Sequence, residues 1–281
     1  MGYENKTRVW VDSGNYDVFD KRTARRMSDK EVTIASPYRR IDNEAMKNNI
    51  KMRILILGNS VKEIGTEAFS RCTNLRNVYL NGVRTIQKGA FFGCSNLKEL
   101  KIPQSVQYLE KYAFMENKGI RQISYEPENR STVLSSDLFR ECNRLRQIIL
   151  PRHLAEIRGG AFYRCKELDG IIFPNSVKRI GKEAFYGNGM TSLDLPEGLL
   201  EIEDSAFFKC NQLEYVCLPR SVKILGKWVF HGCNRLKVLE IPEDPEVIGP
   251  WIINRSCIIR CKKDGRVDQY CQEYGFSVEY L

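Results

Sequence analysis

The stretch AFFGCSNLKELKIP at residues 90–103 decides the fold, because close copies of it return along the chain at a nearly constant interval. The copies read AFSRCTNLRNVYL at 68–80, AFYRCKELDGIIFP at 161–174, AFFKCNQLEYVCLP at 206–219 and VFHGCNRLKVLEIP at 229–242, and more diverged ones begin at 45, 113, 138 and 184. The second residue of each copy is a large apolar residue that we call the anchor. The anchors recur in steps of 22 to 25 residues: Met46, Phe69, Phe91, Phe114, Phe139, Phe162, Phe185, Phe207 and Phe230. A period of this size predicts a solenoid.

Within one repeat, the piece LKELKIP at 97–103 alternates apolar and polar residues, which is strand periodicity. Leu97, Leu100 and Ile102 are expected to point inward, and the residues between them outward. The proline that follows most copies cannot donate a hydrogen bond to a sheet, so it ends each strand. Stacked repeats would then pair their strands as a parallel sheet, with equivalent residues aligned in columns.

A cysteine recurs at one position of the repeat, and asparagine replaces it in three copies. This cysteine ladder consists of Cys72, Cys94, Cys142, Cys165, Cys210 and Cys233, with Asn49, Asn117 and Asn188 in the gaps. Zinc ligands come in short pairs such as C-x2-C, which are absent. We therefore interpret the ladder as small buried side chains that hydrogen-bond a turn, and expect neither a metal nor a cofactor. Parallel, in-register thiols also make disulfides unfavourable.

Four cysteines lie outside the ladder. Cys257, Cys261 and Cys271 have no histidine nearby in sequence to complete a metal site, so we expect them in the core of a closing cap. Cys217 would point outward from its strand and should be the most reactive thiol. Ten cysteines without an export signal fit a reducing compartment.

The frame L-x-x-L-x-L, continued by P-x-S-V-x-x-I-G-x-x-A-F-x-x-C, resembles the BspA-like class of leucine-rich repeats, also found in Treponema, over roughly residues 38–281. The resemblance implies an α/β repeat fold, a right-handed solenoid with a parallel sheet on the concave face and a mostly irregular or short helical convex side. It also implies a closing unit with a short helix around 267–274 between two strands. Members are commonly surface or secreted proteins used in adhesion or partner binding, and the repeats are not known for catalysis.

Three segments are expected along the chain. Residues 1–37 would form an N-terminal capping segment, in which 9–20 could form a hairpin and 21–37 a short basic helix or strand; the alternative is a docking arm. Residues 38–250 would hold about nine repeats of 22–25 residues, and 251–281 a C-terminal capping unit.

Positive charge gathers in the first half of the chain. Residues 1–150 contain 26 Lys and Arg against 17 Asp and Glu, whereas residues 151–281 contain 18 of each. Five adjacent strands carry a cation at the second position of the L-x-x-L-x-L frame, which faces outward, and a sixth cation lies at the fifth position. We call these residues the basic row: Arg53, Arg76, Lys98, Arg121 and Arg146, with Lys101 one column over. The five aligned cations would span about 19 Å.

The other outward positions change character along the chain. An apolar waist is expected in the middle of the face, followed by an acidic half, and tyrosines lie on either side. These residues are Tyr79, Ile149, Ile172, Asp169, Asp194, Glu214, Tyr215 and Glu240. Arginine and tyrosine on an exposed face are residue types that dominate interface energetics. The same cations can also serve only to keep a strand surface soluble.

We therefore predict a non-enzymatic interaction module that binds an acidic protein surface through its concave face. The alternatives are a nucleic-acid or polyanion binder that uses the basic row, and a cell-surface adhesin domain of a longer secreted protein. We find no apolar run that would span a bilayer and no secretory signal in MGYENKTRVWVDSG. We expect a cytoplasmic monomer; a surface or secreted location is the alternative if the sequence is part of a longer chain.

Catalysis finds little support in the sequence. The two histidines, His153 and His231, have no cysteine, serine or carboxylate partner at a motif spacing. The motifs G-x-x-x-x-G-K-[ST], G-x-S-x-G and H-E-x-x-H are absent. We expect no catalytic residues.

Overall fold

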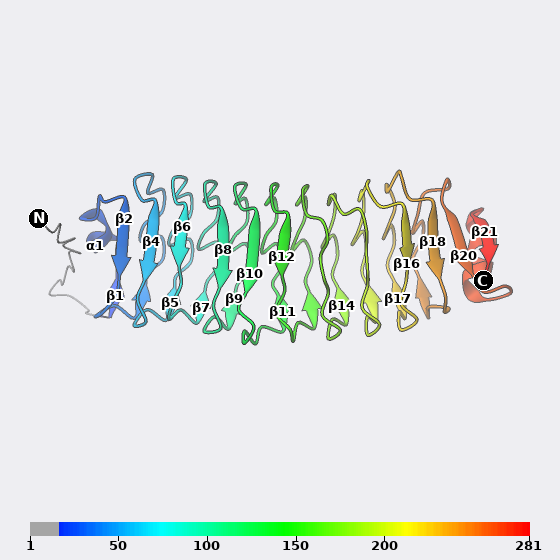
Figure 1. Cartoon of the computed structure of the whole chain (residues 1–281), viewed down its shortest axis with the longest axis horizontal. Coiled ribbons are helices and arrows are strands. Elements are labelled where there is room, and N and C mark those ends of the chain that lie inside the picture. The colour runs from blue at the N-terminus through cyan, green and yellow to red at the C-terminus, as the bar shows by residue number, and fades with distance from the viewer. Residues whose placement is uncertain (1–16) are drawn as a thin grey trace, which may run out of the picture.

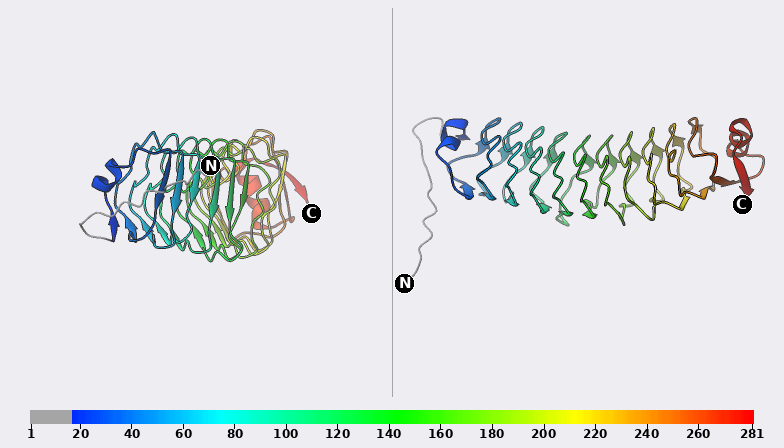
Figure 2. Two further views of the ribbon diagram at one scale, coloured as in Figure 1. Left: turned by 60° about the vertical axis from the view of Figure 1, so that its left-hand side comes forward. Right: turned by 90° about the horizontal axis from the view of Figure 1, so that it is seen from above.

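A computed structural model describes residues 17–281, which form a solenoid of stacked turns running from one end of the molecule to the other (Figure 1). Most turns contain a long strand, a short strand and an irregular segment, and two further views show the same regular stacking (Figure 2). Helix is confined to α1 (Lys21–Arg25) and α2 (Arg266–Tyr274). The predicted leucine-rich-repeat solenoid, with parallel strands and little helix, is confirmed.

The long strands occupy one side of the solenoid, which we call the long-strand face. They pair in register and in parallel as three sheets: β2 (Glu31–Ile34), β4 (Ile54–Leu57) and β6 (Asn77–Tyr79); β8 (Glu99–Ile102), β10 (Gln122–Tyr125) and β12 (Gln147–Ile149); and β16 (Tyr215–Cys217), β18 (Val238–Ile241), β20 (Ile258–Cys261) and β21 (Ser277–Tyr280). In residues 150–214 no long strand forms, and Gly170 there takes a left-handed φ of 63°. Leu97, Leu100 and Ile102 are buried, as the alternation predicted.

The short strands pair in the same parallel manner. One sheet contains β1 (Val18–Phe19), β3 (Arg40–Ile41), β5 (Glu63–Ile64), β7 (Thr85–Ile86) and β9 (Tyr108–Leu109). The other contains β11 (Val133–Leu134), β13 (Glu156–Ile157), β14 (Arg179–Ile180), β15 (Glu201–Ile202), β17 (Ile224–Leu225) and β19 (Val247–Ile248). The break between β9 and β11 falls in the one repeat whose step is 25 residues.

The A-F-x-x-C segments form a third hydrogen-bonded ladder, and we call these segments the back turns. The N–H groups of residues 67, 69 and 71 donate to the carbonyl groups of residues 88, 90 and 92 in the next turn, at 3.0, 2.8 and 2.6 Å. Two residues in each back turn have positive φ, such as Glu67 at 53° and Arg71 at 58°. Gly89 and Gly93 occupy the equivalent positions in the next copy, because glycine takes this conformation without strain.

The anchor phenylalanines stack through the centre of the molecule. All eight are buried, and their ring centroids follow one another at 5.2 to 6.0 Å. The widest gap, between Phe114 and Phe139, lies at the long repeat. The stack continues from turn to turn because the solenoid has no separate central core and each unit contacts only its neighbours.

The cysteine ladder hydrogen-bonds the back turns, as interpreted from the sequence. Cys94 Sγ donates to the carbonyl of Phe69 at 3.2 Å, and Asn117 Nδ2 donates to the carbonyl of Phe91 at 2.8 Å. All six ladder cysteines are free and buried. Burial raises the pKa of the Cys142 thiol to about 12, so this thiol keeps its proton and remains a hydrogen-bond donor at neutral pH.

The two ends of the described chain continue the sheets. β1 pairs in parallel with β3, and β2 pairs with β4. Most of the hairpin predicted for 9–20 lies outside the described residues, while 21–37 contain both α1 and β2. At the other end, α2 lies between β20 and β21, as the resemblance implied. The cap cysteines Cys257, Cys261 and Cys271 are buried and free.

Removing an anchor ring should cost far more stability than removing a ring on the surface. We expect Phe114→Ala to lower the free energy of unfolding by about 3–5 kcal/mol, because the ring is fully buried between two others. Phe92→Ala, which truncates a half-buried ring on the back turn, should cost about 1 kcal/mol. Urea unfolding followed by circular dichroism measures both, and equal losses would contradict the stacked core.

The ladder should accept cysteine in place of asparagine. Asn117 Oδ1 is buried without a hydrogen-bond partner, so Asn117→Cys removes an unsatisfied acceptor while keeping a donor to Phe91. We expect unchanged or higher stability, by up to about 2 kcal/mol. Asn117→Ala, which removes the donor as well, should destabilise. Thermal melting compares the two variants, and a cysteine variant as unstable as the alanine variant would show that the side-chain donor is not what the ladder requires.

Candidate interaction face

Backbone hydrogen bonds hold the basic row in line across the long-strand face. The N–H of Arg76 donates to the carbonyl of Arg53 at 2.7 Å, that of Arg121 to Lys98 at 2.8 Å, and that of Arg146 to Arg121 at 2.9 Å. All five of these side chains are exposed, and each lies directly before one of the long strands β4, β6, β8, β10 and β12. The sequence-predicted row is therefore a set of neighbours on successive turns.

Ion pairing divides the basic row into two parts. Arg146 Nε lies 2.8 Å from Glu167, and Lys101 Nζ lies 3.2 Å from Glu126. The other four members form no ion pair with any residue in 17–281: Arg53, Arg76, Lys98 and Arg121. We call these four the unpaired row. Like charges on adjacent strands repel one another, so these turns carry a charge that nothing in the described chain neutralises.

Large apolar and aromatic side chains lie in another outward column of this face, at the fifth position of the repeat. Tyr79, next to the unpaired row, is 50% exposed, and its hydroxyl has no hydrogen-bond partner within residues 17–281. Ile149 and Ile172, the predicted apolar waist, are 58% and 83% exposed. Ile149 pairs in register with Ser124 on β10. Ile172 lies in the part of the face where no long strand forms.

Two of the four carboxylates of the predicted acidic half, Glu214 and Glu240, are neutralised by neighbouring cations. Glu214 lies 2.7 Å from Arg235 and 3.4 Å from Lys237. Lys237, followed by Arg235, lowers the pKa of the Glu214 carboxyl. Asp169 accepts hydrogen bonds from the backbone N–H and hydroxyl of Thr191 at 2.9 and 3.0 Å. Asp194 is exposed nearby.

Glu240 is the centre of a polar cluster at the end of the face. It accepts a hydrogen bond from the Tyr215 hydroxyl at 3.0 Å and pairs with Arg260 at 3.1 Å. Burial, with the Glu240 carboxylate, raises the pKa of Tyr215 to about 12. Glu240, like Glu214, is thus paired with an opposite charge, unlike the unpaired row.

Cys217 lies beside this cluster. It is the one cysteine of the ten that is not buried, as its outward position predicted. Burial, followed by the nearby Glu240 carboxylate, nevertheless raises its pKa. A raised pKa lowers the fraction of reactive thiolate at neutral pH. The exposure of the Cys217 thiol therefore favours its reaction, while its raised pKa disfavours it.

Residues 17–281 contain no cluster that could hold a metal ion and no helix that could cross a membrane. In that range no three His, Cys, Asp or Glu side chains come together as metal ligands. Both helices of the described chain are too short and too polar to cross a membrane. The ring of His231 packs against Phe208 at 5.7 Å, and its Nδ1 lies 3.3 Å from the carbonyl of Ile253.

Comparison with known proteins agrees with this geometry. The model of the BspA type leucine-rich repeat region matches residues 24–133 and 132–259, with six copies. The chain belongs to the BspA-type leucine-rich repeat family. Leucine-rich repeats of this kind generally serve in protein interaction or adhesion, and the family is typically non-enzymatic.

Two solved structures illustrate the shared fold of this BspA-type chain. A leucine-rich repeat protein from Bacteroides ovatus aligns with a TM-score of 0.61 at 20% identity, over 89% of this chain and 92% of that one. A leucine rich cell surface protein from Faecalibacterium prausnitzii aligns with a TM-score of 0.53 at 20% identity, over 90% and 88%. No curated protein sequence matches the chain.

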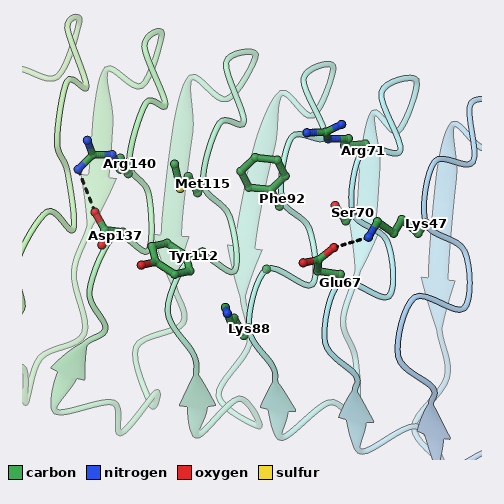
Figure 3. Close-up of a pocket in the computed structure, with 11 residues that line it drawn as sticks. Lys47, Glu67, Ser70, Arg71, Lys88, Phe92, Tyr112, Met115, Asp137 and Arg140 are labelled. Atoms are coloured by element: carbon green, nitrogen blue, oxygen red, sulfur yellow. Dashed lines mark hydrogen bonds and ion pairs between the residues drawn. The ribbon is translucent and has the colours of Figure 1, made fainter.

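Sequence reasoning missed a hollow on the back turns, lined by Phe92, Tyr112 and several charged residues (Figure 3). Its signal in the sequence is weak: Ser70 is a small residue in a column that elsewhere carries long or aromatic side chains, while the column of Gly89 also contains Gly160 and Ser205. A missing side chain is visible only once the columns are aligned. Whether it leaves an open space depends on how the neighbouring side chains turn.

The number of reactive thiols in the BspA-type chain can be measured directly. We expect one of ten cysteines to react with Ellman's reagent in the folded protein, and all ten after denaturation. The reaction of Cys217 should be slow at pH 7 and accelerate as the pH rises, because its raised pKa limits the thiolate. Glu240→Gln should lower that pKa and speed the reaction several-fold at pH 7. A Cys217→Ser variant that still reacts when folded would assign the reactive thiol elsewhere.

Proposed function

We propose that the chain is a non-enzymatic interaction module whose long-strand face binds an acidic protein surface. The unpaired row carries this proposal. Four exposed cations stand on successive turns without a partner, whereas other cations of the same face, such as Arg146 and Arg260, are ion-paired. An acidic partner would relieve their mutual repulsion and gain complementary charge at the same time.

Tyr79 and the apolar waist would supply the packing part of such an interface. Charge alone contributes mostly to association rate and orientation, while buried aromatic and apolar anchors supply most of the binding energy. Tyr79 lies beside the unpaired row, and Ile149 extends the contact toward the middle of the face. The general use of leucine-rich repeats in protein interaction supports this assignment.

A nucleic acid or another polyanion is the second candidate, because a line of arginines also fits a phosphate backbone. Tyr79 is the one exposed aromatic side chain of the described chain in line with the unpaired row, so few bases could stack there. Salt separates the two candidates. Polyanion binding should weaken steeply between 50 and 200 mM salt, whereas binding through Tyr79 and Ile149 should weaken less.

An adhesin role is the third candidate, and it depends on location. The similar protein from Faecalibacterium prausnitzii is described as a cell surface protein. Our expectation of a cytoplasmic protein yields to this alternative if cell fractionation recovers the protein at the surface. The same face would then meet a partner outside the cell.

Charge reversal of the unpaired row tests the proposed function. We expect Arg53→Glu, Arg76→Glu and Arg121→Glu together to weaken capture of the partner from source-cell lysate at least tenfold. Each residue lacks an internal ion pair, so the fold should be unaffected, which circular dichroism and melting check. The matched control reverses three exposed cations elsewhere, Arg84, Arg152 and Lys178, for the same change in net charge.

The outcomes separate the candidates. A protein captured by the wild type and the control, but lost from the row variant, identifies the partner and the site. Equal losses in both variants would indicate a general charge effect. Equal recovery by all three would overturn the proposal, and the basic row would then serve only to keep the strand surface soluble.

A further inference from the structure

A cavity of about 620 Å³ opens on the back turns of the first half of the solenoid. Figure 3 views it from the side opposite the long-strand face, with the long strands behind the pocket residues. Five successive turns line it, from Lys47 to Arg140. The cavity is separate from the unpaired row and stands independently of the proposed function. Its volume suits a small ligand.

Two small residues leave this space open. Ser70 occupies the column that holds Phe92 and Met115 in the next two turns, and Gly89 occupies the column that holds Glu67 and Tyr112. A Cβ atom on Gly89 would lie 3.3 Å from Glu67 Cγ, closer than ordinary packing allows. The hollow is thus bounded by an aromatic and thioether wall on one side and by a charged wall on the other.

The charges around the cavity do not balance. Glu67 pairs with Lys47 at 2.6 Å, and Asp137 pairs with Arg140 at 3.1 Å, so both carboxylates are neutralised. Two lining cations have no carboxylate partner within residues 17–281: Arg71 and Lys88. They lie instead near the aromatic wall, Arg71 at 5.7 Å from the Phe92 ring and Lys88 at 6.0 Å from the Tyr112 ring. The charge that remains in the cavity after ion pairing is therefore positive.

One buried polar group also faces the cavity without a partner. Ser70 is only 2% exposed, lines the cavity, and its hydroxyl makes no hydrogen bond to any residue in 17–281. The Ser70 hydroxyl is not among the fully buried polar atoms that lack a partner, so it opens on the cavity, where water or a ligand hydroxyl can complete its hydrogen bonding. The Tyr112 hydroxyl, which also lines the cavity, is similarly unpaired within the described residues.

We propose that this cavity binds an acidic sugar. Arg71 and Lys88 would attract the carboxylate, and the cation nearer to it would donate charge-assisted hydrogen bonds, which are about twice as strong as neutral ones. The apolar C–H face of the sugar ring would pack on Phe92 and Met115, as aromatic walls favour ligands with one apolar side and one polar edge. Ring hydroxyls would complete the hydrogen bonding of Ser70.

A peptide fits this cavity less well. The back-turn N–H groups of residues 67, 69 and 71 already donate to the next turn, so they cannot receive a peptide as an added strand. A buried peptide would therefore leave its own backbone groups unpaired. A sugar has only hydroxyl groups to satisfy, and those that face the opening remain in water. A nucleotide, with a base on Phe92 and a phosphate on Arg71, is left as an outcome of the test.

Isothermal titration calorimetry on the full chain tests the site with defined probes. Trigalacturonate and 3′-sialyllactose are the acidic sugars, lactose is the neutral one, and a hexaglutamate peptide and uridine monophosphate are the other anions. We expect binding of at least one acidic sugar, and at least tenfold weaker binding of lactose, the peptide and the nucleotide. Binding should also weaken when salt is raised, because two cations hold the carboxylate.

Three variants separate charge from shape. Arg71→Gln with Lys88→Gln removes both free cations, and Ser70→Met fills the hollow with the residue that the same column holds at Met115, leaving the charges in place. Each should weaken acidic-sugar binding at least tenfold. The matched control, Arg164→Gln with Lys182→Gln, changes the equivalent positions of later turns outside the cavity and should leave binding unchanged.

Each remaining outcome would overturn the assignment. If no acidic sugar binds the folded wild type, the cavity has a different ligand. Equal binding by the peptide or the nucleotide would show an anion site without selection for sugar. Binding that survives both the charge variant and the filled variant, in proteins with unchanged circular dichroism, would place the sugar elsewhere on the chain.

Discussion

Backbone hydrogen bonding between successive turns is the constraint on which the rest of this structure depends. The long strands, the short strands and the back turns each form a ladder, and every rung must lie one turn of 22–25 residues from the next. A buried N–H or carbonyl group that is left unpaired costs free energy comparable to a lost hydrogen bond. The backbone therefore fixes which side chains become neighbours, and a residue such as Phe114 always meets the anchors of the two adjacent turns.

This alignment forces equivalent positions together whatever their chemistry. Where the sequence alternates signs, the columns satisfy themselves, as Glu240 and Arg260 show on adjacent strands. Where it repeats one sign, like side chains start from backbone positions only about 5 Å apart, so their charges can separate only as far as the side chains bend. Arg53 and Arg76 are in that position. Their repulsion is a property of the sequence rather than of the fold, which is why the unpaired row argues for a partner.

The period predicted most of the fold, since one correct alignment places every buried anchor, the cysteine ladder and the order of the basic row at once. Finer features depend on side-chain rotamers and local backbone. Nothing in the sequence showed that Glu167 would reach back to Arg146, or that Glu214 and Glu240 would be ion-paired on their own face. The interruption of the long strands in residues 150–214 also escaped prediction, because the apolar pattern continues through it and only Gly170, with its left-handed φ, departs from the repeat. The back-turn hollow could not be predicted, because it depends both on missing side-chain volume and on the conformations of the neighbouring side chains.

The two halves of the solenoid use the same columns differently. In later back turns, Tyr163 and Tyr186 stack at 4.6 Å and fill the column that Ser70 leaves open in an earlier turn. The unpaired row on the opposite face lies on these same early turns. In a solenoid each turn is stabilised mainly by its neighbours, so repulsion and empty space in one region weaken that region without undoing the rest. The early turns can therefore carry exposed charge and an open cavity on two faces, while the later turns, with satisfied charges and stacked rings, keep the array ordered.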